Sequence, residues 1–384
     1  MKYCAVICEL NPFHNGHEYI FRRAREVSGC DGLIALMSGS FVQRAVPASI
    51  DEYSRAECAL RLGADIVIEL PAVYAVASGE IFARGAVDIL NTIPGMSHLV
   101  MGAENADKPL MERIAHIRAS NDAAFSAALS SALGDGLTYA RALTRALSEA
   151  LHDVPSDRTE ALLTCPNNIL AISYAQALAA TDSRIAFVPV QRAKDETRYS
   201  SATALRSDIT ERDEEAYMPP EARGIWRKEK TGDLSYGFGL LVMAALRERP
   251  LSEIAAAPDC AEGFEYKLKA LARSCSGFGE LMSVVPTSRF TRSRIMRICL
   301  QTLLGMTRDM QHCGYANARL LGVREDAKDM LRDLPANIVI GKRGEATVPS
   351  EHMRCFAAER RASDIWSLIA CRPCDFYRRL LVVR

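Results

Sequence analysis

Residues 3–17, with the sequence YCAVICELNPFHNGH, give the clearest indication of the fold. The apolar residues 3–8 are typical of a strand that is buried on both faces of a parallel sheet. His14-Asn15-Gly16-His17 follows, and an amphipathic pattern over residues 18–27 predicts a helix. A buried strand, a tight turn and a helix in this order predict an α/β fold, in which helices cover a doubly wound parallel sheet.

The same alternation continues over roughly the first half of the chain. Short apolar runs bounded by Gly, Pro or polar residues predict strands over residues 32–37, 65–70, 98–102 and 184–190. Helical patterns between them cover residues 51–62, 78–91 and 168–179. We therefore expect a Rossmann-like sheet whose ligand site lies at the carboxyl ends of the strands.

Two regions depart from this alternation. Residues 106–153 are rich in Ala and other good helix formers, which predicts a helical insertion between the fourth and fifth strands. Residues 213–228 combine many charges with Met218-Pro219-Pro220 and are typical of a linker. We expect a catalytic domain over residues 1–210 and a mainly helical C-terminal domain over residues 211–384.

The overall composition is that of an ordinary globular protein. Lys and Arg total 47, as do Asp and Glu, so the net charge is zero and any basic surface must be local. The 12 cysteines are scattered, several of them within apolar runs, and no apolar run is long enough to span a membrane. Because Met1-Lys2 leads directly into a strand, without a signal peptide, we expect a reduced, cytoplasmic protein with no membrane partner.

The turn after the first strand has the chemistry of a phosphate site. His14 and His17 can donate hydrogen bonds to oxygens that gain charge during phosphoryl or nucleotidyl transfer. Gly16 allows a phosphate to approach the backbone, and the N-terminus of the following helix favours an anion. The turn therefore predicts an enzyme that opens ATP at the α-phosphate.

Polar residues also follow the second predicted strand. Ser38 and Ser40 offer hydroxyls on either side of Gly39, which permits a tight turn, and Arg44 can contact an anion. Asp51 opens the next helix, where it can cap the helix or orient a substrate or a histidine. We expect these residues at the same sheet edge as the histidine turn.

The later elements supply further candidates for nucleotide contacts. Gly102 closes the fourth strand, where it lets an adenine or ribose approach the backbone, and Asn167 begins a helix. Arg192 follows the fifth strand. Ser200-Ser201-Ala202-Thr203-Ala204-Leu205-Arg206 then starts another helix and offers hydroxyls, N–H groups and an arginine to phosphate.

His-x-Gly-His, followed about one domain later by Ser-Ser-x-Thr-x-x-Arg, resembles the nucleotidyltransferase superfamily of adenylyl and cytidylyl transferases. Over nearly its whole length the chain resembles more closely the bacterial tRNA(Met) cytidine acetate ligase family. The segments that carry this closer resemblance are residues 11–17, 37–44, 55–57, 65–71, 82–87, 102–104, 166–167, 201–206, 287–291 with Arg294 and Arg297, and 315–323.

The resemblance implies a nucleotidyltransferase-type sheet and an ATP-dependent ligase. Such an enzyme activates acetate to acetyl-adenylate, releases pyrophosphate and acetylates N4 of the wobble cytidine of elongator tRNA(Met). The implied catalytic residues are His14, His17, Ser38, Arg44 and Asp51. The implied ATP-binding residues are Ile7, Cys8, Glu9, Leu10, Asn11, Pro12, Phe13, His14, Asn15, Gly16, His17, Gly102, Asn167, Arg192, Ser200, Ser201, Thr203 and Arg206. Mg²⁺ is expected with the ATP phosphates, although the sequence has no evident carboxylate cage for it.

The chain departs from the family pattern at three places. Arg44-Ala45-Val46-Pro47 stands where Arg-Gly-Glu-Pro is expected, Glu52 stands where lysine is usual, and Asn168 stands where aspartate is usual. Losing a cation beside the phosphates would weaken anion binding.

A cluster of arginines is the candidate contact with RNA. Arg289, Arg292, Arg294 and Arg297 lie close together with little acidic compensation, and clustered arginines suit phosphate contacts. A solvated helix face would explain the charge equally well, and only the resemblance makes tRNA the expected partner.

A zinc site is a separate hypothesis. His352-x-x-Cys355 and Cys371-x-x-Cys374 have the spacing of a structural zinc site. Twelve cysteines make such pairs frequent by chance, so we expect no zinc.

Two other functions stay open. One is a nucleotidyltransferase that acts on a small phosphorylated metabolite, against which the long arginine-bearing helical region argues. The other is an RNA-binding protein without catalysis, which the departures at Ala45, Val46 and Glu52 keep open.

Overall fold

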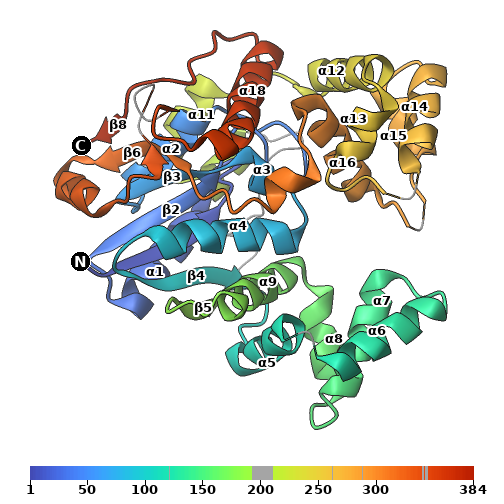
Figure 1. Cartoon of the computed structure of the whole chain (residues 1–384). Coiled ribbons are helices and arrows are strands. Elements are labelled where there is room, and N and C mark those ends of the chain that lie inside the picture. The colour runs from blue at the N-terminus through green and yellow to red at the C-terminus, as the bar shows by residue number, and fades with distance from the viewer. Residues whose placement is uncertain (121, 193–210, 262, 288, 340, 342–344) are drawn as a thin grey trace.

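The centre of the molecule is a twisted sheet (Figure 1). The computed structural model describes residues 1–120, 122–192, 211–261, 263–287, 289–339, 341 and 345–384. Its 8-stranded sheet has the order β5-β4-β1-β2-β3-β6-β7, and β8 pairs with β6. The strands in chain order are β1 (Tyr3–Cys8), β2 (Gly32–Ser38), β3 (Ile66–Leu70), β4 (Met96–Ala103), β5 (Ala186–Gln191), β6 (Ala318–Arg324), β7 (Ile338–Val339) and β8 (Leu381–Val383).

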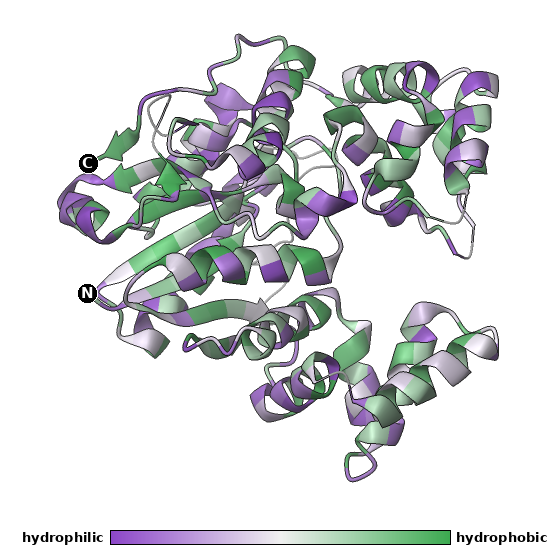
Figure 2. Cartoon of the chain, viewed as in Figure 1, coloured by the Kyte–Doolittle hydropathy of each residue, from purple (hydrophilic) through white to green (hydrophobic). Residues whose placement is uncertain are grey.

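The first five strands are parallel and form the predicted α/β sheet. Residues alternate between two cores, as in β1, where Cys4 and Val6 face one hydrophobic cluster and Ala5 faces the other. Both faces are covered, which explains why the strands are apolar runs rather than alternating patterns. Figure 2 shows the largely hydrophobic sheet inside helices that carry hydrophilic outer faces.

Helices cover the two faces of this sheet. The cluster on one face includes residues of α1 (Asn15–Ser28), α2 (Glu52–Arg61) and α11 (Pro220–Glu229). The cluster on the other face includes residues of α3 (Ala72–Ala75), α4 (Gly79–Thr92), α9 (Pro166–Ala180) and α18 (Met353–Ile369).

Two groups of helices project from one side of the sheet (Figure 1). The first follows β4 and consists of α5 (Lys108–Ala119), α6 (Ala123–Gly134), α7 (Tyr139–Ala150) and α8 (Ser156–Thr164). This group is the predicted insertion, which extends further than residue 153. The second consists of α12 (Ser235–Glu248), α13 (Leu251–Ala256), α14 (Phe264–Ser274), α15 (Phe278–Val284) and α16 (Arg292–Leu304).

The expected division into residues 1–210 and 211–384 needs correction. β6 pairs antiparallel with β3, so the C-terminal part of the chain completes the sheet of the N-terminal part. A single hydrophobic cluster also joins Ile68 of β3 to Phe238 of α12 and Phe356 of α18. The two parts therefore share one sheet and one hydrophobic core.

The expected linker over residues 213–228 is also wrong, because α10 (Glu211–Tyr217) and α11 occupy it. Buried Glu214 accepts hydrogen bonds from Trp226 Nε1 at 3.1 Å and from Arg227 Nε at 2.6 Å. The charges that resembled a linker are thus partly satisfied inside the protein. In the described part of the chain, short 3-10 helices are η2 (Arg308–Gln311), η3 (Glu325–Asp333) and η4 (Ser350–His352).

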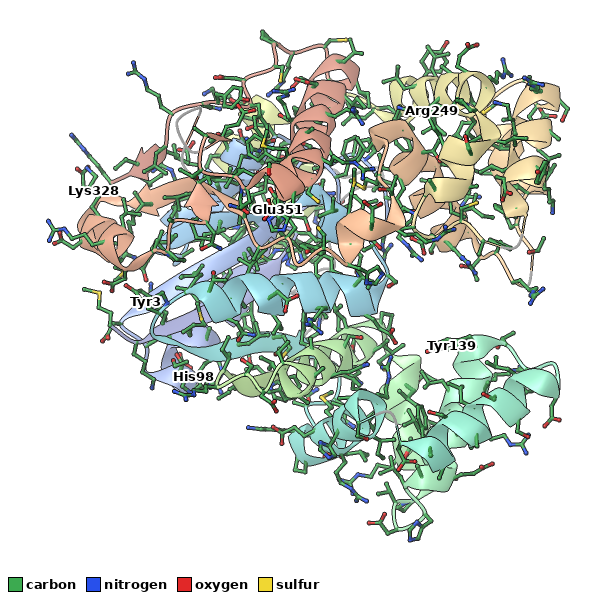
Figure 3. All side chains as sticks on the ribbon, in the orientation of Figure 1. Tyr3, His98, Tyr139, Arg249, Lys328 and Glu351 are labelled. Atoms are coloured by element: carbon green, nitrogen blue, oxygen red, sulfur yellow. The ribbon has the colours of Figure 1, made fainter. Side chains whose placement is uncertain are left out.

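The carboxyl ends of the parallel strands lie on the side of the two helical groups. Tyr3 and His98, near the starts of β1 and β4, mark the opposite edge in Figure 3, whereas Tyr139 begins α7 and Arg249 directly follows α12 in the two projecting groups. Within the described residues, no helix is long and apolar enough to cross a membrane.

Candidate active site

The histidine turn lies between β1 and α1 and is built by mutual capping. His14 is the N-cap of α1, and its Nδ1 accepts a hydrogen bond from the Gly16 N–H at 3.0 Å. His17 Nδ1 in turn accepts from the His14 N–H at 3.1 Å. Since both Nδ1 atoms accept backbone hydrogen bonds, the neutral rings carry their proton on Nε2. The turn thus fixes both tautomers as Nε2–H donors.

The two imidazole rings lie against each other, with centroids 3.8 Å apart. Gly16 is required beside them, because a Cβ at this position would approach His14 Cε1 within 2.8 Å. Burial, followed by the positive potential of His14 and Arg192, lowers the pKa of His17 well below its ordinary value. His17 is therefore neutral at physiological pH and can donate from Nε2 without carrying a charge.

The segment before the turn divides into core and site residues. Cys8, Leu10 and Phe13 are buried in the hydrophobic cluster beneath α1, where they support the turn. Ile7 packs against the cluster on the other face. Pro12 is also buried.

The polar members of the segment are anchored to neighbouring loops. Glu9 Oε1 accepts from the Gln43 N–H at 2.7 Å, and Asn11 Oδ1 accepts from the Ser49 N–H at 2.8 Å. Asn15 Nδ2 donates to the Ala216 carbonyl at 3.0 Å. The loop after β1 is thereby connected to the loop after β2 and to α10.

The loop after β2 holds the next candidates. Ser38 ends β2, and its buried hydroxyl has no hydrogen-bond partner among the described residues. A Cβ on Gly39 would come within 1.9 Å of Glu69 Oε1, so a larger residue at this turn would displace the buried Glu69 side chain. Arg44 is exposed. Ala45, where glycine is expected from the family pattern, has φ +56°, the left-handed conformation that glycine adopts most easily.

Asp51 has a structural role. It is the N-cap of α2, and its Oδ1 accepts from the N–H groups of Tyr53 and Ser54, both at 3.0 Å. Arg372 Nη1 lies 3.7 Å from its carboxylate. Asp51 thus has the capping role that the sequence offered, which satisfies the first N–H groups of the helix, and its catalytic role stays a prediction.

The ends of β4 and β5 form the other half of the sheet edge. Gly102 faces Arg192, whose Cγ would lie 3.3 Å from a Cβ at residue 102. Glu104 Oε1 accepts from Asn167 Nδ2 at 2.5 Å, and its Oε2 accepts from the Asn168 N–H at 3.2 Å. These bonds connect the β4 loop to the N-terminus of α9, which presents Asn167 at the same edge as Gly102 and Arg192.

The departure at Asn168 preserves this connection. Asn168 Oδ1 accepts from the Asn105 N–H at 3.1 Å, a bond that an aspartate could also accept. Ser200, Ser201, Thr203 and Arg206 lie outside the described residues, so their expected place beside the phosphates stays a prediction.

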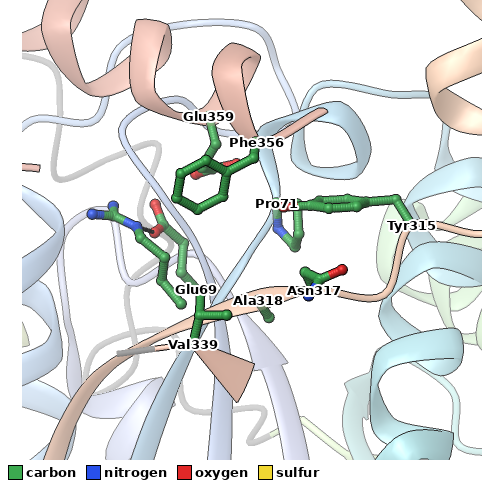
Figure 4. A pocket seen from close by; sticks show the side chains of 9 residues that line it. Glu69, Pro71, Tyr315, Asn317, Ala318, Val339, Phe356 and Glu359 are labelled. Carbon is green, nitrogen blue, oxygen red and sulfur yellow. Dashed lines mark hydrogen bonds and ion pairs between the residues drawn. The ribbon is translucent and has the colours of Figure 1, made fainter. Parts of the chain in front are cut away.

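A buried charged cluster next to this edge was missed by sequence reasoning. Arg319 of β6 lies between the carboxylates of Glu52 and Glu69, with Nη2 3.1 Å from Glu52 Oε1 and an ion pair from Nε to Glu69 Oε2. Figure 4 shows Glu69 and Glu359 on the lining of a small pocket. Burial, and next the Glu69 carboxylate, raise the pKa of Glu359 well above its ordinary value. The buried Glu359 carboxyl therefore holds its proton to a higher pH than an exposed glutamate does.

The cluster explains the departure at Glu52. The side chain is 5% exposed and forms a buried ion pair with Arg319, so it belongs to the interior. One signal was present in the sequence, because Glu69 interrupts the otherwise apolar run of β3. A charge at such a position indicates a buried partner.

The arginines of α16 separate into two kinds. Arg297 forms a bidentate ion pair with Asp259, with N–O distances of 3.0 and 2.8 Å, and its side chain is only 16% exposed. Arg294 Nε donates to the Asp259 carbonyl at 2.9 Å. Arg289 and Arg292 are exposed, although Arg292 Nη1 also donates to the Met282 carbonyl at 3.0 Å. The structure therefore brings only part of the predicted RNA-contacting set to the surface.

The zinc hypothesis is not supported by the arrangement of its residues. Cys355 Sγ lies 3.7 Å from Cys313 Sγ, whereas Cys374 Sγ donates to Asp364 Oδ1 at 2.8 Å. His352 Nε2 lies 3.2 Å from the Cys313 carbonyl oxygen, and Cys371 is exposed. In the part of the chain that the structure describes, no three His, Cys, Asp or Glu side chains are arranged to hold a metal ion.

The chain is similar to known proteins over nearly its whole length. The HIGH Nucleotidyl Transferase family matches residues 1–377. A tRNA(Met) cytidine acetate ligase of Caldanaerobacter subterraneus subsp. tengcongensis is 32% identical, with 99% of this chain and 100% of the relative covered. The ligase of the same name from Clostridium kluyveri is 31% identical, with 88% of each chain covered.

Solved structures agree with this relationship. The crystal structure of Thermotoga maritima TmcAL bound with alpha-thio ATP has a TM-score of 0.91 at 26% identity, and the apo structure of the same protein has a TM-score of 0.92 at 27% identity. Both comparisons cover 100% of each chain. With the histidine turn, the α/β sheet and these similarities in agreement, the chain belongs to the tRNA(Met) cytidine acetate ligase family of HIGH nucleotidyl transferases.

Proposed function

We propose that this protein is an ATP-dependent ligase that acetylates N4 of the wobble cytidine of elongator tRNA(Met). The observation that carries the proposal is the histidine turn, in which both imidazoles present Nε2–H at the N-terminus of α1. Relatives at 31 and 32% identity bear the name tRNA(Met) cytidine acetate ligase, which supplies the substrate class.

The first half-reaction activates acetate. An acetate oxygen attacks the α-phosphorus of ATP, the bond from this phosphorus to the bridging oxygen breaks, and pyrophosphate leaves with the bonding electrons. Charge develops on the α-phosphate oxygens and on the bridging oxygen. Nε2–H of His14 and His17 donates to these oxygens, and the positive end of the α1 helix dipole favours the developing charge. The buried Ser38 hydroxyl, unpartnered among the described residues, is a further candidate donor.

The rest of the sheet edge binds the nucleotide. We assign Gly102, Asn167 and Arg192 to ATP, because they lie together at the ends of β4 and β5 and at the start of α9. Ser200, Ser201, Thr203 and Arg206 join this assignment on their sequence pattern alone. Mg²⁺ is expected to arrive with the ATP phosphates, whose charge it neutralises.

The second half-reaction transfers the acetyl group to RNA. The cytidine N4 attacks the acetyl carbon, AMP leaves with one acetate oxygen, and N4 loses a proton. Because an exocyclic amine is a weak nucleophile, the reaction depends on an activated acyl group held close to it. Two exposed arginines are the ones that we assign to tRNA phosphates: Arg289, which precedes α16, and Arg292, its first residue. With tRNA as the substrate, we expect the reaction to occur in the cytoplasm.

One assay tests the whole proposal. Purified protein is incubated with ATP, Mg²⁺, labelled acetate and unmodified tRNA, and pyrophosphate and RNA-bound label are measured. The proposal predicts one pyrophosphate for each acetyl group on tRNA. A tRNA in which the wobble cytidine is replaced should acquire no label. Pyrophosphate formed only with a small phosphorylated substrate would indicate a metabolite nucleotidyltransferase. RNA binding without either product would indicate a non-catalytic protein.

A further inference from the structure

Among the described residues, Arg55 of α2 is the largest fully buried side chain, with 0% exposure. All of its side-chain hydrogen bonds to described residues run to main-chain carbonyls. Nη1 donates to Glu9 O and Ser38 O, both at 2.8 Å, Nη2 donates to Gly39 O at 2.5 Å, and Nε donates to Ile50 O at 3.2 Å. The guanidinium therefore makes four bonds without a direct ion pair to a described carboxylate.

These acceptors belong to three different segments of the sheet edge. Glu9 follows β1 and precedes the histidine turn, Ser38 and Gly39 end β2, and Ile50 precedes α2. One side chain therefore fixes the loop after β1 relative to the loop after β2. The loop after β1 carries His14 and His17, so its position decides where their Nε2–H groups point.

An arginine is the side chain that suits this arrangement. Its planar guanidinium offers donors at fixed angles, so it can reach carbonyls on two strand ends at once. Lysine carries the same charge, but its compact ammonium cannot span the same set of acceptors. A buried cation without a paired carboxylate is costly to solvate, which makes a purely space-filling role a poor explanation.

We propose that Arg55 is a positioning residue for the first half-reaction: it holds the β1 and β2 loops in the spacing that aims the two histidines at the α-phosphate. This inference rests on the proposed function, because it takes the histidine turn as the place where ATP reacts. Its distinctive consequence is that the shape of the guanidinium, and not only its charge, determines the rate.

Substitution of Arg55 separates shape from charge. Arg55→Lys keeps the cation and loses the planar donor set, and Arg55→Gln loses both. We expect Arg55→Lys to lower kcat for acetate-dependent pyrophosphate release by about 10- to 100-fold, because small misplacements of catalytic groups have effects of this size. The KM for ATP should change by less than about threefold, since the charge is kept.

The matched control is Arg61 on the same helix, which is half-exposed and pairs with Glu57 at 2.7 Å. Arg61→Lys and Arg61→Gln should leave kcat and KM unchanged. Rates are expressed per site competent to bind an ATP analogue, so that a loss of folded protein does not count as a loss of turnover. Folded Arg55→Lys protein with kcat within twofold of wild type would overturn the proposal.

The wild-type protein supplies a second test that does not depend on a variant folding. If Arg55 fixes the loops in advance, amide hydrogen exchange over residues 9–17 and 38–50 should be slow without ligand and change little with a non-hydrolysable ATP analogue. Rapid exchange that becomes slow only with the analogue would overturn the proposal. This measurement needs neither acetate nor tRNA, so its failure is distinct from a failure of the proposed ligase activity.

Discussion

The sequence predicted a phosphate site from two histidines and an RNA contact from four arginines at and just before α16. In the structure the histidines lie together, whereas the arginines do not share one environment. His14 and His17 meet with ring centroids 3.8 Å apart, as the short spacing indicates. The arginines of α16 separate, because Arg297 turns inward to Asp259 while Arg292 remains exposed. The histidines are positioned by bonds within residues 14–17, whereas Arg297 is positioned by a residue far away in the sequence.

The comparison shows which functional assignments a sequence can support. A capping motif carries its geometry with it, because its donors and acceptors are near neighbours in the chain. A cluster of charged residues in the sequence does not show where their side chains point, because tertiary partners decide which of them face solvent. The following substitutions test this distinction.

The largest effect is expected at the histidines. In His14→Asn the new side chain can still cap α1, and in His17→Asn it can still accept from the residue 14 N–H. In both variants the donor to phosphate is differently placed. We expect His14→Asn and His17→Asn each to lower the rate of acetate-dependent pyrophosphate release by about 100- to 1,000-fold, the usual cost of losing a donor to transition-state charge. The exposed His116, changed to Asn, is the control. Retention of more than a third of the wild-type rate in either variant would show that the turn has another role.

Arg297→Ala should lower the stability of the protein without lowering its affinity for tRNA. The change leaves the Asp259 carboxylate, which is 14% exposed, without its bidentate partner. We expect a loss of about 2 kcal/mol in the free energy of unfolding, measured by urea denaturation. At a temperature where the variant is folded, its affinity for tRNA should match that of wild type. A large loss of affinity with unchanged stability would place Arg297 in the interface.

Changing both Arg289 and Arg292 to Ala should lower the affinity for tRNA. We expect the Kd for tRNA to rise by about tenfold, and the slope of log Kd against log salt to become shallower by about 0.7 to 0.9 for each phosphate that the variant no longer neutralises. ATP cleavage without tRNA should be unchanged. An unaltered Kd and an unaltered salt slope would remove these arginines from the RNA surface.

The smallest effect is a pH dependence of stability due to His17. Its pKa in the folded protein lies well below the ordinary value of 6.5, so below this pH the unfolded chain binds a proton that the folded chain does not. Stability due to this group is therefore complete above pH 6.5 and decreases as the pH falls toward the folded pKa, by at most about 1.4 kcal/mol for each pH unit. Urea denaturation of wild type and His17→Gln between pH 5 and 8 should give a shallower decline in the variant. Parallel curves would contradict a depressed pKa.

The parallel part of the sheet was predictable because buried strands and capped helices have local patterns. The expected first strand has the same bounds as β1, Tyr3–Cys8. β6 was not predicted, because Arg319 and Gly322 interrupt its apolar residues. Only the tertiary partners Glu52 and Glu69 make a buried arginine acceptable in that strand.

The candidate site was predictable to a similar extent. The histidines and the Gly102–Arg192 edge follow from strand ends in a parallel sheet. The capping role offered for Asp51 is confirmed by its bonds from the N–H groups of Tyr53 and Ser54, whereas its catalytic role stays a prediction. The four carbonyl acceptors of Arg55 come from three segments, so no local pattern reveals them.

The central claim is that acetate attacks the α-phosphorus of ATP at the histidine turn, and oxygen labelling tests it most directly. The wild-type enzyme is supplied with acetate labelled with ¹⁸O at both oxygens, ATP and tRNA, and the products are analysed by mass spectrometry. The account predicts one labelled oxygen in AMP, none in pyrophosphate, and loss of labelled AMP in His14→Asn. Labelled inorganic phosphate with formation of ADP, or acetylated tRNA with unlabelled AMP, would contradict it.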